Sequence, residues 1–239
     1  MKLVKYIFSI VILLSISNII FAQDRLLKVV VALTGNIYNE ATLEPITVFI
    51  KVFDENGNRV ASTRSNSAEN GYYYITGLKP GKNYTININQ NDFFKESYQI
   101  SIPPTDKYVE ISRDFLVKPL VVGTKLMLIV PPFELNKSKL RYGAELILDN
   151  YKNSFLNNPN VNIEIQCYAD NDENKAENKQ LTEERCKSIM NYLVSNGIES
   201  SRISIKGFET TDPNNPPPKK KRAKGKRYIG TTYFVITKI

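Results

Sequence analysis

Apolar and polar residues alternate between positions 161 and 168, a period of two that is typical of a strand with one buried face. The apolar set is Val161, Ile163, Ile165 and Cys167. Further along, apolar residues recur at i, i+3, i+4 and i+7, which indicates the core-facing stripe of a helix. This second set is Cys186, Ile189, Met190 and Leu193. Residues 162–197 therefore predict a strand, a polar loop and an amphipathic helix.

Thr182 is the N-cap that we expect for this helix, because its hydroxyl can accept from an amide of the first turn. Glu183 and Glu184 would then lie in that turn, and Gly197 would end the helix.

The same patterns continue on both sides. Leu140, Ala144, Ile147, Leu148, Tyr151 and Phe155 predict a helix from about Ser138 to Leu156, which ends before Pro159. Apolar or β-branched runs at 126–130, 203–208 and 228–237 predict strands. The order βαβαββ indicates an α+β domain at 125–239, with a small mixed sheet and helices on one side.

Residues 24–117 show short apolar runs and no helical period. The runs lie at Val29–Leu33, Thr47–Phe53, Tyr72–Thr76, Tyr84–Ile88, Tyr98–Ile102 and Tyr108–Phe115. Turn signals separate them, such as Pro80-Gly81. This spacing predicts an all-β sandwich, joined by a linker at 118–124 to the second domain.

The tyrosines at 72–74 allow two interpretations, a sugar-stacking site or an alternating strand with Tyr73 pointing inward. The alternating strand is favoured, and the domain is interpreted as a spacer or a protein-contact module.

Residues 1–22 resemble a signal peptide. Lys2 and Lys5 precede an apolar run from Tyr6 to Leu14 and beyond, and Ala22 precedes a polar stretch. The alternative is an uncleaved anchor, but Ser15 and later polar residues interrupt the run. We expect cleavage, export and no further hydrophobic span in the mature chain.

The chain of 239 residues carries a formal charge of +8 and has no histidine. A Ser-His-Asp triad and a His-ligated metal are therefore excluded, and its two cysteines cannot supply four thiolates to zinc. Asp170 and Asp172 lie in one polar loop with no reason for split pKa values. The sequence thus predicts a protein that is not an enzyme and has no cofactor or metal.

Cys167 and Cys186 both point inward by their periodicities. In an oxidising compartment they can form a disulfide, and otherwise they pack as small core thiols.

Seven of the ten residues from Pro218 to Arg227 are basic. A nucleic-acid partner does not fit an exported chain. The stretch is either a solvated loop before the last strand or a segment attracted to the anionic wall or lipid surface.

Asp170 leaves the predicted strand, and Arg185 lies near the predicted start of the helix. The two would offer an anion and a cation at the rim of one loop, which suits a ligand that carries both charges. An EF-hand is excluded in the same loop, because Lys175 and Leu181 occupy its glycine and glutamate positions.

The residues A-D at 169–170, Asn178 and L-T-E-E-R at 181–185 resemble the motif of the peptidoglycan-binding OmpA C-terminal-like domain. R-I-S-I-K-G-F-E from Arg202 and K-R-A-K-G-K-R-Y from position 221 resemble later segments of that family, and the resemblance covers about 121–239. It implies that Asp170 and Arg185 bind the diaminopimelate of the wall peptide, with Asn178 and Arg227 near the ligand.

This chain departs from the family pattern at four positions. Cys167, Tyr168 and Ala169 stand where the family has Gly, His and Thr, and Gly225 replaces an Asn.

The first domain is similar to carboxypeptidase-regulatory-like (transthyretin-like) sandwiches. T-G-N-I-Y from Thr34 and N-G-Y-Y-Y-I-T-G-L-K-P-G from Asn70 carry this resemblance.

These observations predict a non-enzymatic envelope protein that holds peptidoglycan non-covalently. It would lie in the periplasm of a Gram-negative type envelope, at the outer membrane or the cell wall. The departures from the motif leave an alternative open, in which a degenerate domain docks onto an envelope protein in a structural or assembly role.

Overall fold

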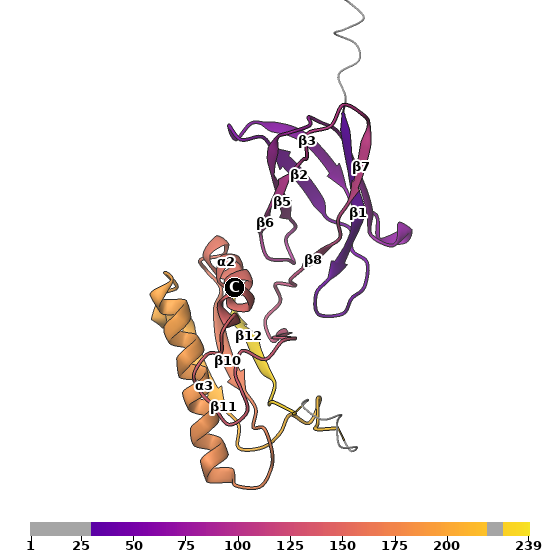
Figure 1. Ribbon diagram of the computed structural model, residues 1–239. Coiled ribbons are helices and arrows are strands. Elements are labelled where there is room, and N and C mark those ends of the chain that lie inside the picture. The colour runs from indigo at the N-terminus through magenta and orange to yellow at the C-terminus, as the bar shows by residue number, and fades with distance from the viewer. Residues whose placement is uncertain (1–29, 219–226) are drawn as a thin grey trace, which may run out of the picture.

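The computed structural model describes residues 30–218 and 227–239 (Figure 1). The predicted signal peptide and residues 219–226 of the basic stretch lie outside these residues. No helix of the described chain has the length and apolar character needed to cross a membrane.

Residues 30–117, here called the N-terminal unit, form two four-stranded sheets that share one core. The first sheet holds β1 (Val31–Asn39), β4 (Tyr72–Leu78), β7 (Val109–Ser112) and β8 (Phe115–Val117). The second runs in the order β3 (Arg59–Arg64), β2 (Phe49–Phe53), β5 (Asn83–Asn89) and β6 (Glu96–Ser101). A short 3-10 helix, η1, spans Ser67–Glu69.

Tyr73 is buried whereas Tyr72 and Tyr74 are exposed, as the alternating interpretation predicts. The Tyr73 hydroxyl donates to the Arg113 carbonyl at 2.7 Å. Pro80-Gly81 makes the expected turn between β4 and β5, with Gly81 at a φ of 68°. The pattern did not predict β3, because its residues are mostly polar and none is buried.

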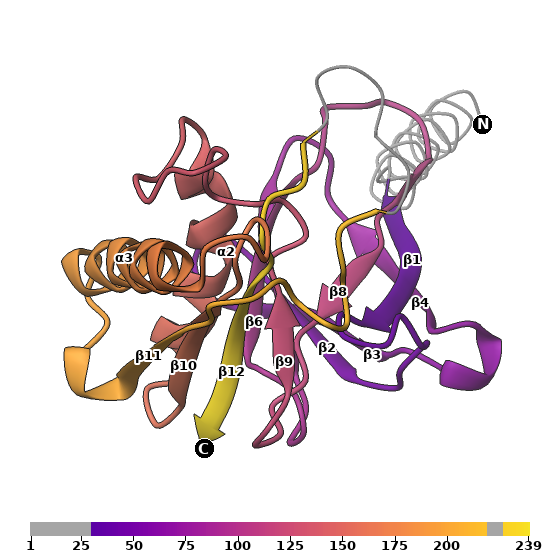
Figure 2. The same ribbon diagram turned by 90° about the horizontal axis from the view of Figure 1, so that it is seen from below.

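Residues from 125 onward, here called the C-terminal unit, follow the predicted order βαβαββ. The elements are β9 (Lys125–Met127), α2 (Ala144–Asn157), β10 (Asn162–Cys167), α3 (Lys175–Ser195), η2 (Ser200–Arg202), β11 (Ile203–Gly207) and β12 (Thr232–Lys238). The sheet order is β11-β10-β12-β9, with β10 and β11 parallel and the other pairs antiparallel. Both helices lie on one side of this sheet (Figure 2).

The start of α2 differs from the prediction of Ser138. The chain first folds back, since the Arg141 amide donates to the Pro132 carbonyl and Phe133 forms a bridge with Leu140. Gly143 then takes a φ of 79°, a left-handed conformation that glycine adopts without strain, and α2 begins at Ala144. Tertiary pairing thus overrides the helical period of 138–143.

The start of α3 was also predicted wrongly, and Thr182 is not its N-cap. The helix begins at Lys175, and the Asn174 side chain accepts from the Glu177 amide at 3.3 Å. Thr182 is buried inside the helix, and its hydroxyl donates to a backbone carbonyl such as that of Phe208 at 3.0 Å. Arg185 therefore lies in the middle of α3 and not in its first turn.

The end strands are shorter than their apolar runs. β9 spans Lys125–Met127 and so includes only the first two residues of the run 126–130, and β12 begins at Thr232. Just before β12, Gly230 passes so close to Tyr168 that an added Cβ would lie 1.9 Å from the Tyr168 carbonyl oxygen. Residues 228–231 have no regular strand structure, although the Tyr168 amide donates to the Thr231 carbonyl at 2.9 Å.

The two cysteines are free thiols in the structure, so the disulfide is not formed. Both lie in the core between β10 and α3, and Cys186 is 3.3 Å from the Ile165 carbonyl oxygen. Burial raises the pKa of the Cys167 thiol well above its ordinary value, which keeps it protonated.

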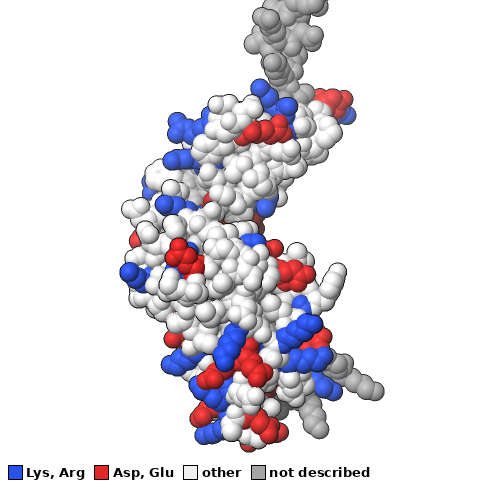
Figure 3. All heavy atoms as spheres, turned by 90° about the vertical axis from the view of Figure 1, so that its left-hand side faces the viewer, with Lys and Arg blue, Asp and Glu red and all other residues white. Residues whose placement is uncertain are grey.

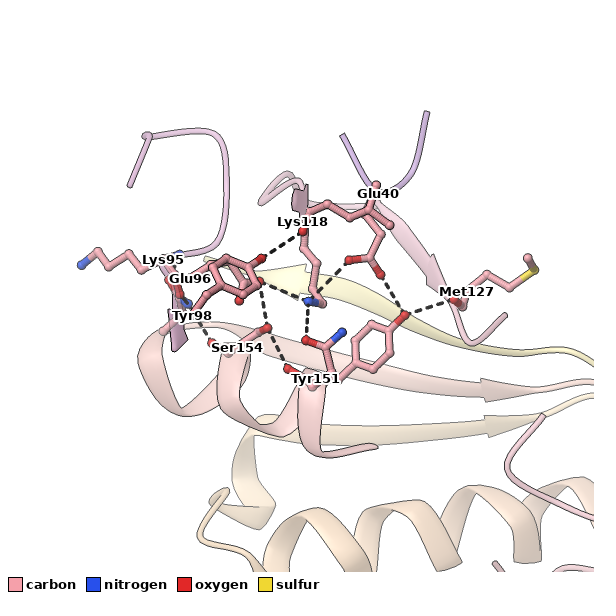
Figure 4. A network of polar contacts seen from close by, with 11 residues as sticks. Glu40, Lys95, Glu96, Tyr98, Lys118, Met127, Tyr151 and Ser154 are labelled. Carbon is pink, nitrogen blue, oxygen red and sulfur yellow. Dashed lines mark hydrogen bonds and ion pairs between the residues drawn. The ribbon is translucent and has the colours of Figure 1, made fainter. Parts of the chain in front are cut away.

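The predicted linker 118–124 begins inside a packed joint between the two units (Figure 4). Lys118 is 1% exposed, and its ammonium lies 3.2 Å from Glu96 and 3.4 Å from Glu40. It also donates to Asn150 of α2 at 3.2 Å. Phe94 completes the joint by packing edge-on against Phe155 in the core of the C-terminal unit.

Charged side chains of both signs intermix over the lower part of the face seen in Figure 3. On α3, Lys179 and Glu183 form an ion pair at 3.3 Å. The exposed surface of α3 therefore carries both positive and negative charge.

Candidate functional site

Asp170 and Arg185 face each other as a bidentate ion pair. Asp170 follows β10 by three residues, and Arg185 projects from the middle of α3 toward it. Arg185 Nη1 donates to Asp170 Oδ1 at 2.7 Å, and Nη2 donates to Oδ2 at 2.8 Å. The two parallel bonds are the strongest geometry for a guanidinium with a carboxylate.

Backbone groups from two other segments complete this pair. The Asn136 amide donates to Asp170 Oδ2 at 2.9 Å, and the Gly230 amide donates to Oδ1 at 2.7 Å. Arg185 donates to the carbonyls of Lys137 and Glu134 at 2.9 and 3.1 Å. The pair thus fastens the 133–137 segment and the approach to β12 onto the end of β10.

Both side chains of the pair are 1% exposed. Burial raises the pKa of Asp170, but the hydrogen bonds and charge of Arg185 outweigh it, with help from the amides of Asn136 and Gly230. The net effect holds the pKa of this carboxyl below its ordinary value, so Asp170 is ionised at neutral pH.

This arrangement corrects the expectation of a charge pair offered at a loop rim. Asp170 and Arg185 form hydrogen bonds with each other and with backbone groups. A ligand that bound to them would have to exchange with these partners. The Glu134–Lys137 segment is the part that covers the pair, and Asn136 within it is exposed with a φ of 55°.

Asn178 lies on α3 two turns before Arg185 and is buried. Its side-chain amide donates to the carbonyls of Asn171 and Glu209 at 2.7 and 3.1 Å. Asn178 therefore ties the loop after β10 to the loop after β11, which is a positioning role in this conformation.

A polar cavity of about 360 Å³ opens beside the ion pair. Its lining includes Asn136, Asn171, Asn174, Glu177, Asn178 and Leu181. Side-chain amides and carboxylates dominate this lining, with Leu181 as the apolar wall. The cavity has the donors and acceptors to hold a peptide-like ligand next to Asp170.

Arg227 lies apart from this cavity. It is exposed and lines a second, larger cavity of about 770 Å³ together with Arg141, Glu134 and Tyr228. Phe133 and Glu134 also line the second cavity, and the Arg185 guanidinium lies over the Phe133 ring. The structure therefore brings Asp170, Arg185 and Asn178 together and places Arg227 at the second cavity.

Asn136 and Gly230 contribute to the site without having been predicted. Both act through backbone amides, so their side-chain types carry little signal. The close approach of Gly230 to Tyr168 is visible only in the folded chain.

In the loop between β10 and α3, Asp172 accepts from the Thr211 amide and hydroxyl at 2.7 and 2.9 Å. Within the described residues, no group of three or more acidic or cysteine side chains could hold a metal ion.

With this geometry in place, comparison with known proteins gives the family of the segment that carries the site. Residues 132–227 form an OmpA family domain. The match includes Asp170, Asn178 and Arg185, and it ends at Arg227. It leaves the N-terminal unit outside.

Two curated proteins are similar to part of this chain. Outer membrane protein A of Salmonella typhi is 31% identical over 83 residues, which are 34% of this chain and 24% of that protein. The photosystem I P700 chlorophyll a apoprotein A2 of Gloeobacter violaceus is 28% identical over 112 residues, or 46% of this chain and 13% of that protein. The chain thus spans less than a quarter of the length of either relative.

Among solved structures, the peptidoglycan-associated lipoprotein of Burkholderia pseudomallei is similar at a TM-score of 0.36 and 15% identity. The likeness covers 44% of this chain and 86% of that one.

Proposed function

We propose that this chain is a non-enzymatic protein of the cell envelope that binds peptidoglycan through its OmpA family domain. The observation that carries the proposal is the Asp170–Arg185 pair beside a polar cavity, inside a segment that matches this family. The family match supports an envelope location, in the periplasm at the outer membrane or the wall.

The ligand in this proposal is the diaminopimelate residue of the wall peptide. Its free end carries an ammonium and a carboxylate on one carbon, which is the charge pattern that Asp170 and Arg185 complement. The cavity lined by Asn136, Asn178 and Leu181 receives the side chain and the neighbouring peptide groups.

Binding requires that the cover of the pair gives way. The Glu134 and Lys137 carbonyls release Arg185 to the ligand carboxylate, and the Asn136 amide releases Asp170 to the ammonium. Each released bond joins a charged side chain to a neutral backbone group, and the bond that replaces it joins two opposite charges. Asn178 keeps the loop after β10 in place during the exchange.

A second candidate function is docking onto a protein of the envelope in an assembly role. The closed, fully bonded pair favours it, because a site that has lost its ligand can keep the same residues as a structural clamp. Recovery of one stoichiometric partner from envelope extract, without wall binding, would support this role.

Co-sedimentation with purified sacculi tests the proposed function. The mature chain is compared with Leu181→Arg, which fills the cavity with a long charged side chain from a half-buried position and leaves the ion pair intact. Lys187→Glu is the matched control, since it changes charge on the exposed face of the same helix.

We expect wild type and Lys187→Glu to sediment at moderate salt and Leu181→Arg to stay in solution. Equal sedimentation of all three would contradict the proposed cavity. Binding that vanishes with salt in wild type would show a non-specific polycation instead.

A further inference from the structure

The second cavity contains cationic groups that the described structure leaves without an anion. It lies between the loop after β9 and the two ends of the β11–β12 connection. Arg141 reaches it from the turn before α2, and Arg227 from the approach to β12. Neither guanidinium forms an ion pair within the described residues.

Arg141 shows the clearest sign of a missing partner. Its Nε is buried and has no hydrogen-bond partner among the described residues. A buried donor without an acceptor costs about 1–3 kcal/mol. Arg141 also lines the cavity, so an oxyanion bound there would lie beside this guanidinium.

The acidic groups nearby are already engaged. Glu134 pairs with Lys137. The hydrogen bond from Lys137 and the charges of Lys137 and Arg141 hold the pKa of Glu134 below its ordinary value. Asp212 is fully buried and accepts from Tyr233 at 2.5 Å and Thr231 at 2.7 Å. The cavity therefore keeps a net positive character.

The other walls are a mixture of apolar and amide side chains. Met127, Ile129 and Ile229 supply apolar surface, and Asn214 supplies an amide. Such a lining fits an amphiphilic group with a carboxylate better than a bare inorganic ion, since the ion would leave the apolar surface unused.

The position of the cavity points to the same ligand as the first one. The 133–135 segment lines this cavity, and the next residue, Asn136, lines the polar one. The two cavities therefore adjoin along residues 133–136, and a peptide bound in the polar cavity would extend past this segment into the second cavity. The wall peptide carries further free carboxylates within that reach.

We infer that this second cavity is a carboxylate subsite for the wall peptide, with Arg141 and Arg227 as its binding residues. The inference rests on the proposed function, because it extends the same ligand beyond the diaminopimelate end. In this assignment, Arg227 binds a carboxylate of the wall peptide other than the one that binds Arg185.

The test uses the mature full chain and two soluble fragments, both muramyl tripeptides that end in diaminopimelate. One has a free glutamate carboxylate and the other has that carboxylate amidated. Arg227→Gln and Arg141→Gln are compared with Arg59→Gln, which removes an exposed arginine from β3. Arg141→Lys keeps the charge but removes the buried Nε and serves as a folding check.

We expect wild type and Arg59→Gln to bind the free-carboxylate fragment about tenfold more tightly than the amidated one, as one charge-assisted contact allows. Arg141→Gln and Arg227→Gln should lose this preference, and Arg141→Lys should keep part of it. Unchanged preference in both glutamine variants would overturn the inference. So would equal binding of the two fragments by wild type together with competition by inorganic phosphate, which would assign the cavity to phosphate.

The outcome separates this inference from the proposed function. If Leu181→Arg abolishes binding of both fragments while Arg141→Gln and Arg227→Gln bind like wild type, only the second subsite fails. If wild type binds neither fragment, the proposed function fails first.

Discussion

At the scale of single residues, the main feature of the candidate site is the buried ion pair of Asp170 and Arg185. A buried pair gains little net stability, because desolvation of both ions offsets their attraction, but breaking it leaves one charge alone. Asp170 and Arg185 limit that cost by making six hydrogen bonds, two to each other and four to the backbone. The pair therefore specifies where the 133–137 segment and Gly230 lie more than it adds to stability.

Asp170→Asn tests this role through pH. At pH 7 we expect a loss of about 3–5 kcal/mol in the free energy of unfolding, because Arg185 stays buried without its anion. The folded-state pKa of Asp170 is lowered, so its contribution is present above the unfolded pKa of about 3.9 and is lost as pH falls below it. Urea unfolding at several pH values should show the gap between variant and wild type closing in acid.

A gap that stays constant from pH 7 to pH 3 would contradict the ionised, paired state of Asp170. Asp172→Asn is the matched control, because it makes the same change two residues away, where the partner is neutral Thr211.

At the scale of elements, α3 holds the candidate site together. Its first half carries Asn178 toward two loops, its middle carries Arg185 toward Asp170, and its apolar stripe of Cys186, Ile189 and Leu193 packs on the sheet. One rigid helix thus sets the separation between the polar cavity and the ion pair. Residues on a helix are held more precisely than residues on loops.

Asn178→Ala should loosen the two loops that this helix fastens. The substitution leaves the Asn171 and Glu209 carbonyls without their donor, which costs about 1–3 kcal/mol of stability. Amide hydrogen exchange should rise in 170–174 and 208–212. Gln180→Ala on the exposed side of α3 should leave this exchange at its wild-type level, and matching profiles for both variants would refute the fastening role.

The pattern of apolar residues predicted β10, the stripe of α3 and the buried Tyr73 because period alone decides which face is buried. The motif spacing also brought Asp170, Asn178 and Arg185 into consideration, and the structure places them together. The first two turns of α3 were not predicted, because residues 175–180 are mostly polar and continue the polar loop before them. The backbone partners at Asn136 and Gly230 depend on contacts between distant segments, which a local pattern does not contain.

At the scale of the whole molecule, the two units meet through charge as well as apolar contact. The ammonium of Lys118 lies between Glu96, Glu40 and Asn150, and Ser154 donates to Glu96 at 2.9 Å (Figure 4). Burial raises the pKa of Glu96, and the charge of Lys118 opposes this shift. The segment predicted as a linker thus begins as a structural joint that fixes the C-terminal unit against the N-terminal unit.

Lys118→Met should cost about 3–5 kcal/mol at pH 7, because Glu96 and Glu40 lose their buried cation. Wild type should unfold in one transition, and the variant should show two as the units separate. The deficit should shrink in acid, since protonation of Glu96 removes the unpaired charge and its raised pKa makes that protonation easier. Calorimetry at pH 7 and pH 5 checks both effects.

Lys95→Met provides the control at an exposed neighbour, where the same side-chain change meets no buried acid. An unaltered single transition in Lys118→Met would mean that the joint does not couple the units.

The central claim is that the Asp170–Arg185 pair recognises an ammonium and a carboxylate on one carbon. The most direct measurement is the affinity of the mature chain for two wall tripeptides that differ only in their third residue, diaminopimelate or lysine. Lysine keeps the ammonium and lacks the distal carboxylate that would bind Arg185. The account predicts at least about tenfold tighter binding of the diaminopimelate peptide, as one charge-assisted pair allows. Equal affinity for both peptides would contradict it.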